Sequence, residues 1–349
     1  DVRLQTCLAT REAEESAALH ALLALVSSET GVDLARYKEN TLRRQTLRRS
    51  RSLGHGRLAD YLTHVQSHPE ELGLLQHCFM ISVSSFFRDG EVFEALADAL
   101  RTLLLTKPEG EPLRVWVPAC ATGEEAYSIA ILLAEVLGER LGRQELRVFA
   151  SDIDQEALEF ARAGLYAAGD MAGMERGRLS RWFRPDAGGW RVSKVLREMC
   201  VFSVHDLTGD PPFIRMDLVS CRNILIYFKA QQQAELIRTF HFALNPSGLL
   251  LLGQSESAGS AGGLFEAIDP AVKLYRRRAT ATRHPHRSVR LAGVLDRLVR
   301  PALPEPGGAE RSQALVGRCR EMMLEAYGPP GVLVDAGFVG EGIFPDDRL

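Results

Sequence analysis

Two adjacent glutamates, Glu124 and Glu125, stand at a turn that has the form of a ligand-binding loop. They occur in "VPACATGEEAYSIAILLAE", where one glycine separates an apolar strand-like segment from an amphipathic helical one. A nucleotide phosphate at such a turn is held by the backbone amides of several glycines, and carboxylates repel it. The turn therefore favours a ligand that carries positive charge and no phosphate.

A third acid, Asp152, ends the next apolar segment, "LRVFASD". At this position of a parallel sheet, an acid typically accepts hydrogen bonds from ribose hydroxyls. S-Adenosylmethionine carries a sulfonium, an ammonium and a ribose, so Glu124 and Asp152 suit its ammonium and its ribose. The alternative interpretation is that Glu124 and Glu125 only favour the helix dipole, and that Asp152 only caps the following helix.

Other chemistries have weaker support in the sequence. The six cysteines show no CxxC or regular spacing, so we expect reduced thiols and no metal site. His205 and His241 are isolated, and "GQSES" lacks the second glycine of a nucleophile elbow. A GxGxxA match at residues 54–59 lies in a basic helical region with no strand before it. A nicotinamide-dependent oxidoreductase is therefore disfavoured.

The composition is that of a globular protein. The chain has 349 residues, of which 46% are apolar and 25% are charged, with a formal net charge of −3. An acidic balance argues against nucleic-acid binding, and no apolar run approaches the ~20 residues that span a bilayer. The N-terminus lacks the basic and apolar pattern of a signal peptide. We expect a cytoplasmic protein without membrane insertion.

Strand-like and helical segments alternate from about residue 113 to residue 252. This rhythm predicts an α/β domain with a doubly wound parallel sheet covered by helices on both faces. The carboxyl ends of parallel strands meet at one edge, so "PACATGEE" and "SDID" are expected to lie together there. Residues 166–205 interrupt the rhythm with a glycine turn and short strands, which predicts a small inserted β-subdomain.

Residues 15–95 have the leucine spacing of an all-helical domain. Arginines concentrate between residues 43 and 57, and Arg44 and Arg48 fall on one helix face. Such a face is either simply solvated or binds an anionic partner. A segment rich in proline, glycine and basic residues at 279–310 predicts a linker, and residues 311–349 begin a further module that they do not complete.

Six motifs in this chain resemble, in the same order, those of the chemoreceptor glutamate methyltransferases, the CheR family of bacterial chemotaxis. The resemblance spans about residues 30–278. It rests on "GVDLARYKENTLRRQTLRR", "ISVSSFFRD", "PACATGEEAYSIA", "FASDIDQEALEFARAGLY", "CRNILIYF" and "LNPSGLLLLGQSES". It implies a Rossmann-like class I methyltransferase domain at 96–278 and a receptor-docking helical domain at 15–95. Residues 311–349 resemble the opening of a PAS module, which implies a fragment of a larger esterase–methyltransferase–PAS fusion.

The resemblance also implies a set of site residues. Relatives often have asparagine where this chain has Ser82, and Arg88 is expected near the carboxylate of the cofactor. Tyr227 is expected next to the transferred methyl group, and Arg222 with Asn223 at the floor of that pocket. Arg88 and Tyr227 are thus the catalytic candidates. The cofactor-binding candidates are Ser82, Ser84, Arg88, Glu124, Asp152, Asp206, Leu207, Arg222 and Asn223.

The implied function is an S-adenosyl-L-methionine-dependent O-methyltransferase that forms glutamyl methyl esters on chemoreceptors and releases S-adenosyl-L-homocysteine. Arg44 and Arg48 would contact the acidic receptor helices. A receptor glutamate is already anionic at neutral pH, because its ordinary pKa is ~4.3, so no general base is expected. Two alternatives stay open: a catalytically silent scaffold or sensor that binds the same cofactor, and a methyltransferase that acts on a small carboxylic acid.

Overall fold

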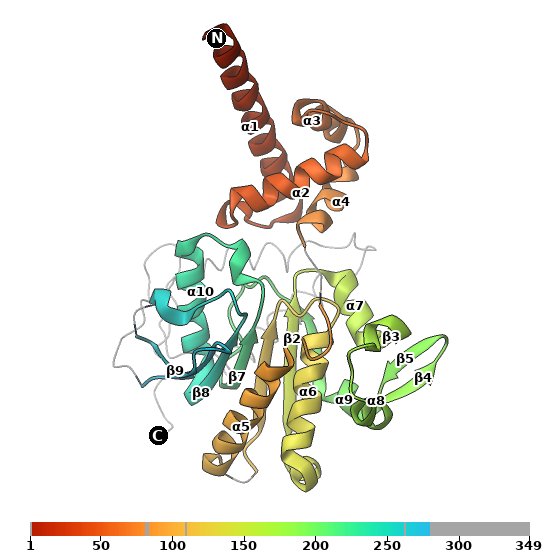
Figure 1. The fold of residues 1–349 in the computed structure, drawn as a ribbon, viewed down its shortest axis with the longest axis vertical. Helices are drawn as coiled ribbons and strands as arrows, with labels where there is room; N and C mark the ends of the chain where they lie inside the picture. The colour runs from red at the N-terminus through yellow and green to blue at the C-terminus, as the bar shows by residue number, and fades with distance from the viewer. Residues whose placement is uncertain (1, 81–83, 109, 262, 280–349) are drawn as a thin grey trace, which may run out of the picture. The chain divides into compact units, whose positions relative to one another are not determined.

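The computed structural model describes residues 2–80, 84–108, 110–261 and 263–279 (Figure 1). Ser82, the expected module at 311–349 and nearly all of the expected linker at 279–310 lie outside these residues. No helix in the described ranges is long and apolar enough to cross a membrane.

The N-terminal part is helical. It comprises α1 (Val2–Thr30), the 3-10 turn η1 (Leu34–Arg36), α2 (Glu39–Ser52), α3 (Leu58–Ser67) and α4 (Glu71–Phe79). Leucines of α1, α2, α3 and α4 are buried against one another and against Tyr61, which is fully buried. Helical spacing places these leucines on one face of each helix, so that their burial holds the helices together.

One buried acid, Glu71, fixes α4 against α2 and α3. Its carboxylate accepts two hydrogen bonds from the Arg49 guanidinium, from Nε and Nη2, both at 2.7 Å, and one from the Tyr61 hydroxyl, also at 2.7 Å. The paired guanidinium holds the pKa of Glu71 below its ordinary value. Because Arg49 is turned inward, the neighbouring arginines of α2 project from a fixed helix.

The larger part is an α/β domain with a seven-stranded sheet in the order β6-β2-β1-β7-β8-β10-β9. Pairing is parallel from β6 to β8, and β10 pairs antiparallel with both β8 and β9. This confirms the predicted doubly wound α/β fold. The strands are β1 (Leu113–Pro118), β2 (Leu146–Asp152), β6 (Cys200–Val204), β7 (Met216–Cys221), β8 (Leu244–Leu252), β9 (Phe265–Asp269) and β10 (Leu274–Arg277).

Alternation along β1 explains why helices cover both faces of the sheet. Val115 and Val117 join the apolar core that includes α5 (Gly90–Thr106) and α6 (Glu124–Leu137). Trp116, between them, joins the core of the opposite face with α10 (Ala230–Ala243). Successive side chains of a strand point to opposite faces, so a strand that is apolar throughout must be buried on both sides.

A small antiparallel sheet, in the order β3-β5-β4, follows α7 (Gln155–Ala163) and lies beside the main sheet (Figure 1). Its strands are β3 (Leu165–Ala167), β4 (Phe183–Asp186) and β5 (Gly189–Val192), with α8 (Arg176–Trp182) before β4. Residues 200–204, which we expected in this insertion, instead form β6 at the edge of the main sheet. The helix α9 (Lys194–Met199) runs directly into β6, so no turn residue marks the start of that strand in the sequence.

Candidate active site

The turn between β1 and α6 has an unusual backbone. Ala119, Ala121 and Gly123 all have positive φ, of 54°, 47° and 96°. A Cβ added at Gly123 would lie 2.8 Å from the Cβ of Ala161, so only glycine fits there without a shift. The two alanines occupy a region that costs side-chain-bearing residues energy. The surrounding contacts must therefore hold the turn.

Asp152, at the end of β2, supplies one of those contacts. Its Oδ2 accepts a hydrogen bond from the backbone N–H of Ala121 at 2.8 Å, and its Oδ1 accepts one from the N–H of Asp154 at 3.0 Å. Burial raises the pKa of Asp152, and these amides oppose the increase. The same carboxylate thus holds the β1–α6 turn and lines the cavity next to it.

This cavity lies beyond the carboxyl ends of β1, β2 and β7, the edge at which the sequence placed the site. Residues from α4 and from the segment after α1 also line it. Eight of the ten predicted cofactor-binding and catalytic residues line this one cavity: Ser84, Arg88, Asp152, Asp206, Leu207, Arg222, Asn223 and Tyr227.

Glu124 is one of the predicted cofactor-binding residues that do not line this cavity. Its carboxylate accepts a hydrogen bond from the Thr122 hydroxyl, with O–O distances of 2.9 and 2.7 Å. Burial raises the pKa of Glu124, and its hydrogen bond with Ser84 places it next to a residue that lines the cavity. Glu125 lines the cavity instead. Successive helical residues point about 100° apart, so two adjacent acids cannot face the same side.

Arg222, just after β7, ties three segments together. Its Nη1 donates to Glu125 Oε2 at 2.9 Å, and its Nη2 donates to Asp89 Oδ2 at 2.7 Å and to the Arg88 carbonyl at 3.0 Å. The side chain of Arg222 is 3% exposed. Two carboxylates therefore neutralise its charge, and the guanidinium holds the backbone of Arg88 at the cavity.

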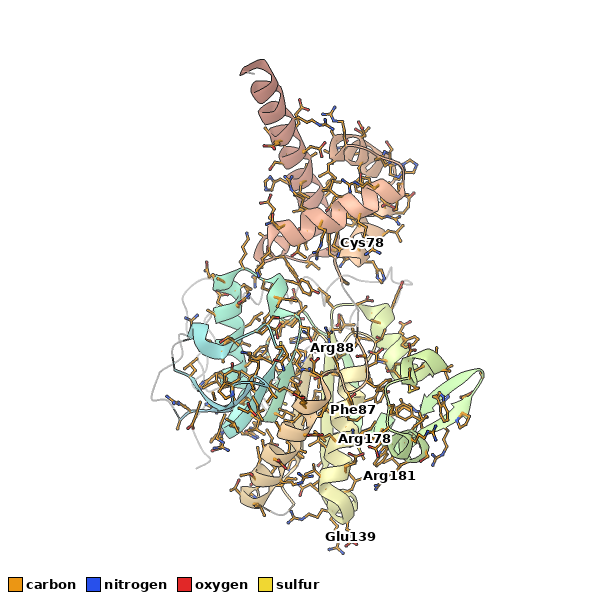
Figure 2. The ribbon with its side chains drawn as sticks, viewed as in Figure 1. Cys78, Phe87, Arg88, Glu139, Arg178 and Arg181 are labelled. Carbon is orange, nitrogen blue, oxygen red and sulfur yellow. The ribbon has the colours of Figure 1, made fainter. Side chains whose placement is uncertain are left out.

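The segment that carries Arg88 is further fixed by packing. Phe87, next to it, lies under the guanidinium of Arg178 of α8, 4.1 Å from the ring centroid. Figure 2 shows Phe87, Arg88 and Arg178 near one another in the middle of the α/β domain. Arg178 in turn donates hydrogen bonds from Nε and Nη2 to the carboxylate of Glu135 on α6. The segment that carries Arg88 is thus held against α8 through Phe87, and α8 is held against α6.

The loop after β7, which carries Asn223 and Tyr227, is held by a buried acid that we did not predict. Glu256 accepts the backbone N–H groups of Asn223 at 3.1 Å, Leu225 at 2.7 Å, Ile226 at 3.4 Å and Gly253 at 2.6 Å. The residue is 5% exposed. The sequence signal that could have identified Glu256 is an acid shortly after a buried strand, in "GQSES".

Asp206 and Leu207 line the cavity after β6. Asp206 Oδ1 accepts both the N–H and the hydroxyl of Thr208, each at 2.8 Å. One carboxylate oxygen of Asp206 is therefore engaged in its own turn.

Strained backbone also clusters around this cavity. Of nine non-glycine residues with positive φ in the described chain, five lie in its loops: Phe87, Asp89, Ala119, Ala121 and Asn223. Such residues commonly cluster at functional sites.

The predicted basic face is a separate feature on α2. Arg44 and Arg48, both exposed, line one shallow hollow with Arg43 and Arg51. Of the other arginines in this stretch, Arg49 pairs with Glu71, and Arg57 pairs with acids of α1. The structure therefore separates four outward-facing arginines from two that serve the helical domain itself.

Two family models match the chain. The CheR methyltransferase SAM-binding domain covers residues 82–273, and the CheR methyltransferase all-alpha domain covers residues 17–78. The chain is 34% identical over 249 residues to chemotaxis protein methyltransferase 2 of Pseudomonas aeruginosa, covering 70% of this chain and 87% of that protein. It is 37% identical over 244 residues to the chemotaxis protein methyltransferase of Escherichia coli K12, covering 67% and 82%.

A third relative is much longer than this chain. The uncharacterized 104.1 kDa protein in the hypE 3' region of Rhodobacter capsulatus is 37% identical over 265 residues, which cover 75% of this chain. The matched region spans 28% of that relative.

Proposed function

Because the chain belongs to the CheR methyltransferase family, we propose that it methylates glutamate side chains of a chemoreceptor to form glutamyl methyl esters. The matched domain binds S-adenosylmethionine, which is the methyl donor and leaves as S-adenosylhomocysteine. The single observation that carries the proposal is the cavity beyond β1, β2 and β7, where Asp152, Arg88 and Tyr227 converge.

The residues of this cavity fit that donor. Asp152 and Asp206 offer carboxylates to ribose hydroxyls and to an exocyclic amine, and Arg88 offers a guanidinium to a carboxylate. The β1–α6 turn presents Glu125 to the cavity and has no run of glycines that would approach a phosphate. Glu125 is paired with Arg222, so Asp152 and Asp206 are the carboxylates that favour a cationic ligand over a dinucleotide.

The protein's task in the reaction is orientation. S-Adenosylmethionine supplies an electrophilic methyl group on a sulfonium, and the acceptor glutamate is anionic at neutral pH without a base. We assign the positioning of that carboxylate to Asn223 and Tyr227, since both line the cavity and Glu256 holds the amides of their loop. Alignment of this kind contributes several kcal/mol, up to ~7–11 in ideal cases.

We assign receptor docking to the basic hollow of α2. Arg44 and Arg48 are exposed there, and no ion pair involves them among the residues that the structure describes. A cluster of like charges attracts an oppositely charged partner and speeds its encounter. An acidic helical surface of a receptor is the partner that suits this hollow.

We also propose that the chain works as part of a longer protein. The matched region makes up 28% of the Rhodobacter capsulatus relative, which supports an arrangement with further domains.

Methyl-labelled S-adenosylmethionine and receptor fragments test the proposal. We expect label to enter a fragment with glutamates at its methylation sites and to be released by mild base, as an ester must be. The matched control is a fragment in which those glutamates are alanines. Cofactor binding without transfer to any carboxylate would refute the transferase and support the silent scaffold. Transfer only to small carboxylic acids would refute the receptor as acceptor.

A further inference from the structure

A short extended segment of the helical domain pairs with the loop that carries Tyr227. The N–H of Lys38 donates to the Tyr227 carbonyl at 2.8 Å, and the N–H of Lys229 donates to the Arg36 carbonyl at 3.0 Å. These two bonds flank an antiparallel bridge between Tyr37 and Phe228. The helical domain is therefore joined to the loop that carries Tyr227 by backbone pairing.

Side chains strengthen this pairing. The rings of Tyr37 and Phe228 lie with their centroids 4.5 Å apart, at an interplanar angle of 43°. The Arg36 guanidinium donates to the carbonyl of Thr208, whose amide and hydroxyl are bonded to Asp206. The segment at residues 36–38 thus contacts both the Tyr227 loop and the turn that presents Asp206.

Tyr37 is also part of the cavity wall. It lines the same cavity as Asp152, Asp206 and Tyr227, although it comes from the other domain. Burial raises the pKa of Tyr37, and the nearby charges of Asp206 and Asp152 raise it further. A tyrosine hydroxyl is protonated at neutral pH, since its ordinary pKa is ~10, so Tyr37 offers a hydrogen-bond donor in the cavity that Asp152 and Asp206 also line.

We propose that Tyr37 is a cofactor-binding residue, contributed by the helical domain, through which cofactor binding tightens the pairing of residues 36–38 with the Tyr227 loop. The identity of the cofactor rests on the proposed function. Tyr37 adds an aromatic ring and a neutral donor to the cavity that Asp152 and Asp206 line. The cavity is complete only when both domains contribute to it.

The proposal connects the two sites of the protein. Helix α2 begins at Glu39, directly after Lys38, and carries the basic hollow with Arg44 and Arg48. Ordering of residues 36–38 by the cofactor therefore fixes the first turn of α2. This coupling is reciprocal. If the cofactor raises the affinity of the hollow for a partner by some factor, that partner raises the affinity of the cavity for the cofactor by the same factor.

Binding of S-adenosylhomocysteine to the whole chain, measured by isothermal titration calorimetry, provides the first test. We expect Tyr37→Ala to weaken binding about tenfold. Tyr37→Phe keeps the ring and its packing on Phe228, and we expect a loss of about threefold for the missing donor. The control is Leu74→Ala on α4, since Leu74 is 50% exposed and does not line the cavity.

Hydrogen exchange of the Lys38 and Lys229 amides provides a second readout, independent of activity. We expect S-adenosylhomocysteine to slow the exchange of both amides in the parent chain and in Leu74→Ala. In Tyr37→Ala that slowing should be lost, while thermal unfolding confirms that the variant is folded.

The outcomes separate this inference from the proposed function. If the parent binds the ligand and both Tyr37 variants bind it equally well, the inference is overturned and the proposed function stands. Unchanged exchange at Lys38 and Lys229 on ligand binding overturns the coupling in the same way. If the parent chain does not bind S-adenosylhomocysteine, the proposed function and the inference fall together.

Discussion

Replacement of Glu256 by glutamine should loosen the loop of Asn223 and Tyr227 without removing any residue that lines the cavity. In the parent chain one buried carboxylate accepts four backbone N–H groups, three of them at 3.1 Å or less. Glutamine has nearly the same shape but only one acceptor oxygen. Its amide group would face N–H donors, so at least one buried donor would lose its partner.

The expected cost follows from that count. A buried donor without a partner costs ~1–3 kcal/mol, and hydrogen bonds to a charged acceptor contribute more than neutral ones. We therefore expect Glu256→Gln to lower the free energy of unfolding by about 2–4 kcal/mol. For a domain of this size that corresponds to a fall in Tm of roughly 5–10 °C. The residue is 5% exposed, so water cannot replace the lost partners.

Activity and binding should respond differently. The single-turnover rate of methyl transfer to a receptor fragment should fall at least about tenfold, because orientation of the acceptor depends on this loop. Affinity for S-adenosylhomocysteine should change less, since Glu256 does not line the cavity. Glu266→Gln on β9, an exposed glutamate, is the matched control. Equal Tm and equal transfer rates for the two variants would show that the carboxylate does not hold the loop.

Three further predictions concern other parts of the chain. Arg44→Glu with Arg48→Glu should weaken receptor methylation at least about tenfold by charge reversal while calorimetry shows unchanged cofactor affinity; loss of that affinity would refute a docking role. Gly123→Ala should lower Tm and abolish cofactor binding, since φ is 96° and the added Cβ has no room; a variant with parental binding would contradict this. Arg49 lowers the pKa of Glu71 in the folded protein. The pair therefore contributes its full stabilisation above the unfolded-state pKa of ~4.3, and this contribution is lost as the pH falls through the lower folded-state pKa. Glu71→Gln should therefore cost about 2 kcal/mol at pH 7 and flatten the acid side of the stability curve, as urea unfolding between pH 2 and pH 7 would measure.

The fold could be predicted because its signal is periodic. Alternating strand-like and helical segments have one economical arrangement, the parallel sheet with helices on both faces, and this sheet also fixes where the loops after β1, β2 and β7 meet. The convergence of Asp152, Asp206 and Asn223 on one cavity follows from that topology.

Which of Glu124 and Glu125 lines the cavity could not be predicted in the same way. It depends on the rotation of α6 about its axis, and both residues begin the helix with the same charge. The ion pairs of Arg222 could not be predicted for a different reason. Its partners Glu125 and Asp89 lie 97 and 133 residues away in sequence. No local pattern records a contact over that distance, and the role of Tyr37 in the cavity wall was hidden likewise.

The position of β1 in the sheet decides when this protein can first bind a ligand during its synthesis. Strand β1 pairs with β2 on one side and with β7 on the other, and the amide of Arg114 reaches a carboxylate 103 residues further along the chain, on Asp217. A nascent chain that has emerged only as far as α7 therefore has β1 and β2 but an open edge and half a binding site. The cavity is therefore complete only after translation has passed β7 and the loop of Tyr227.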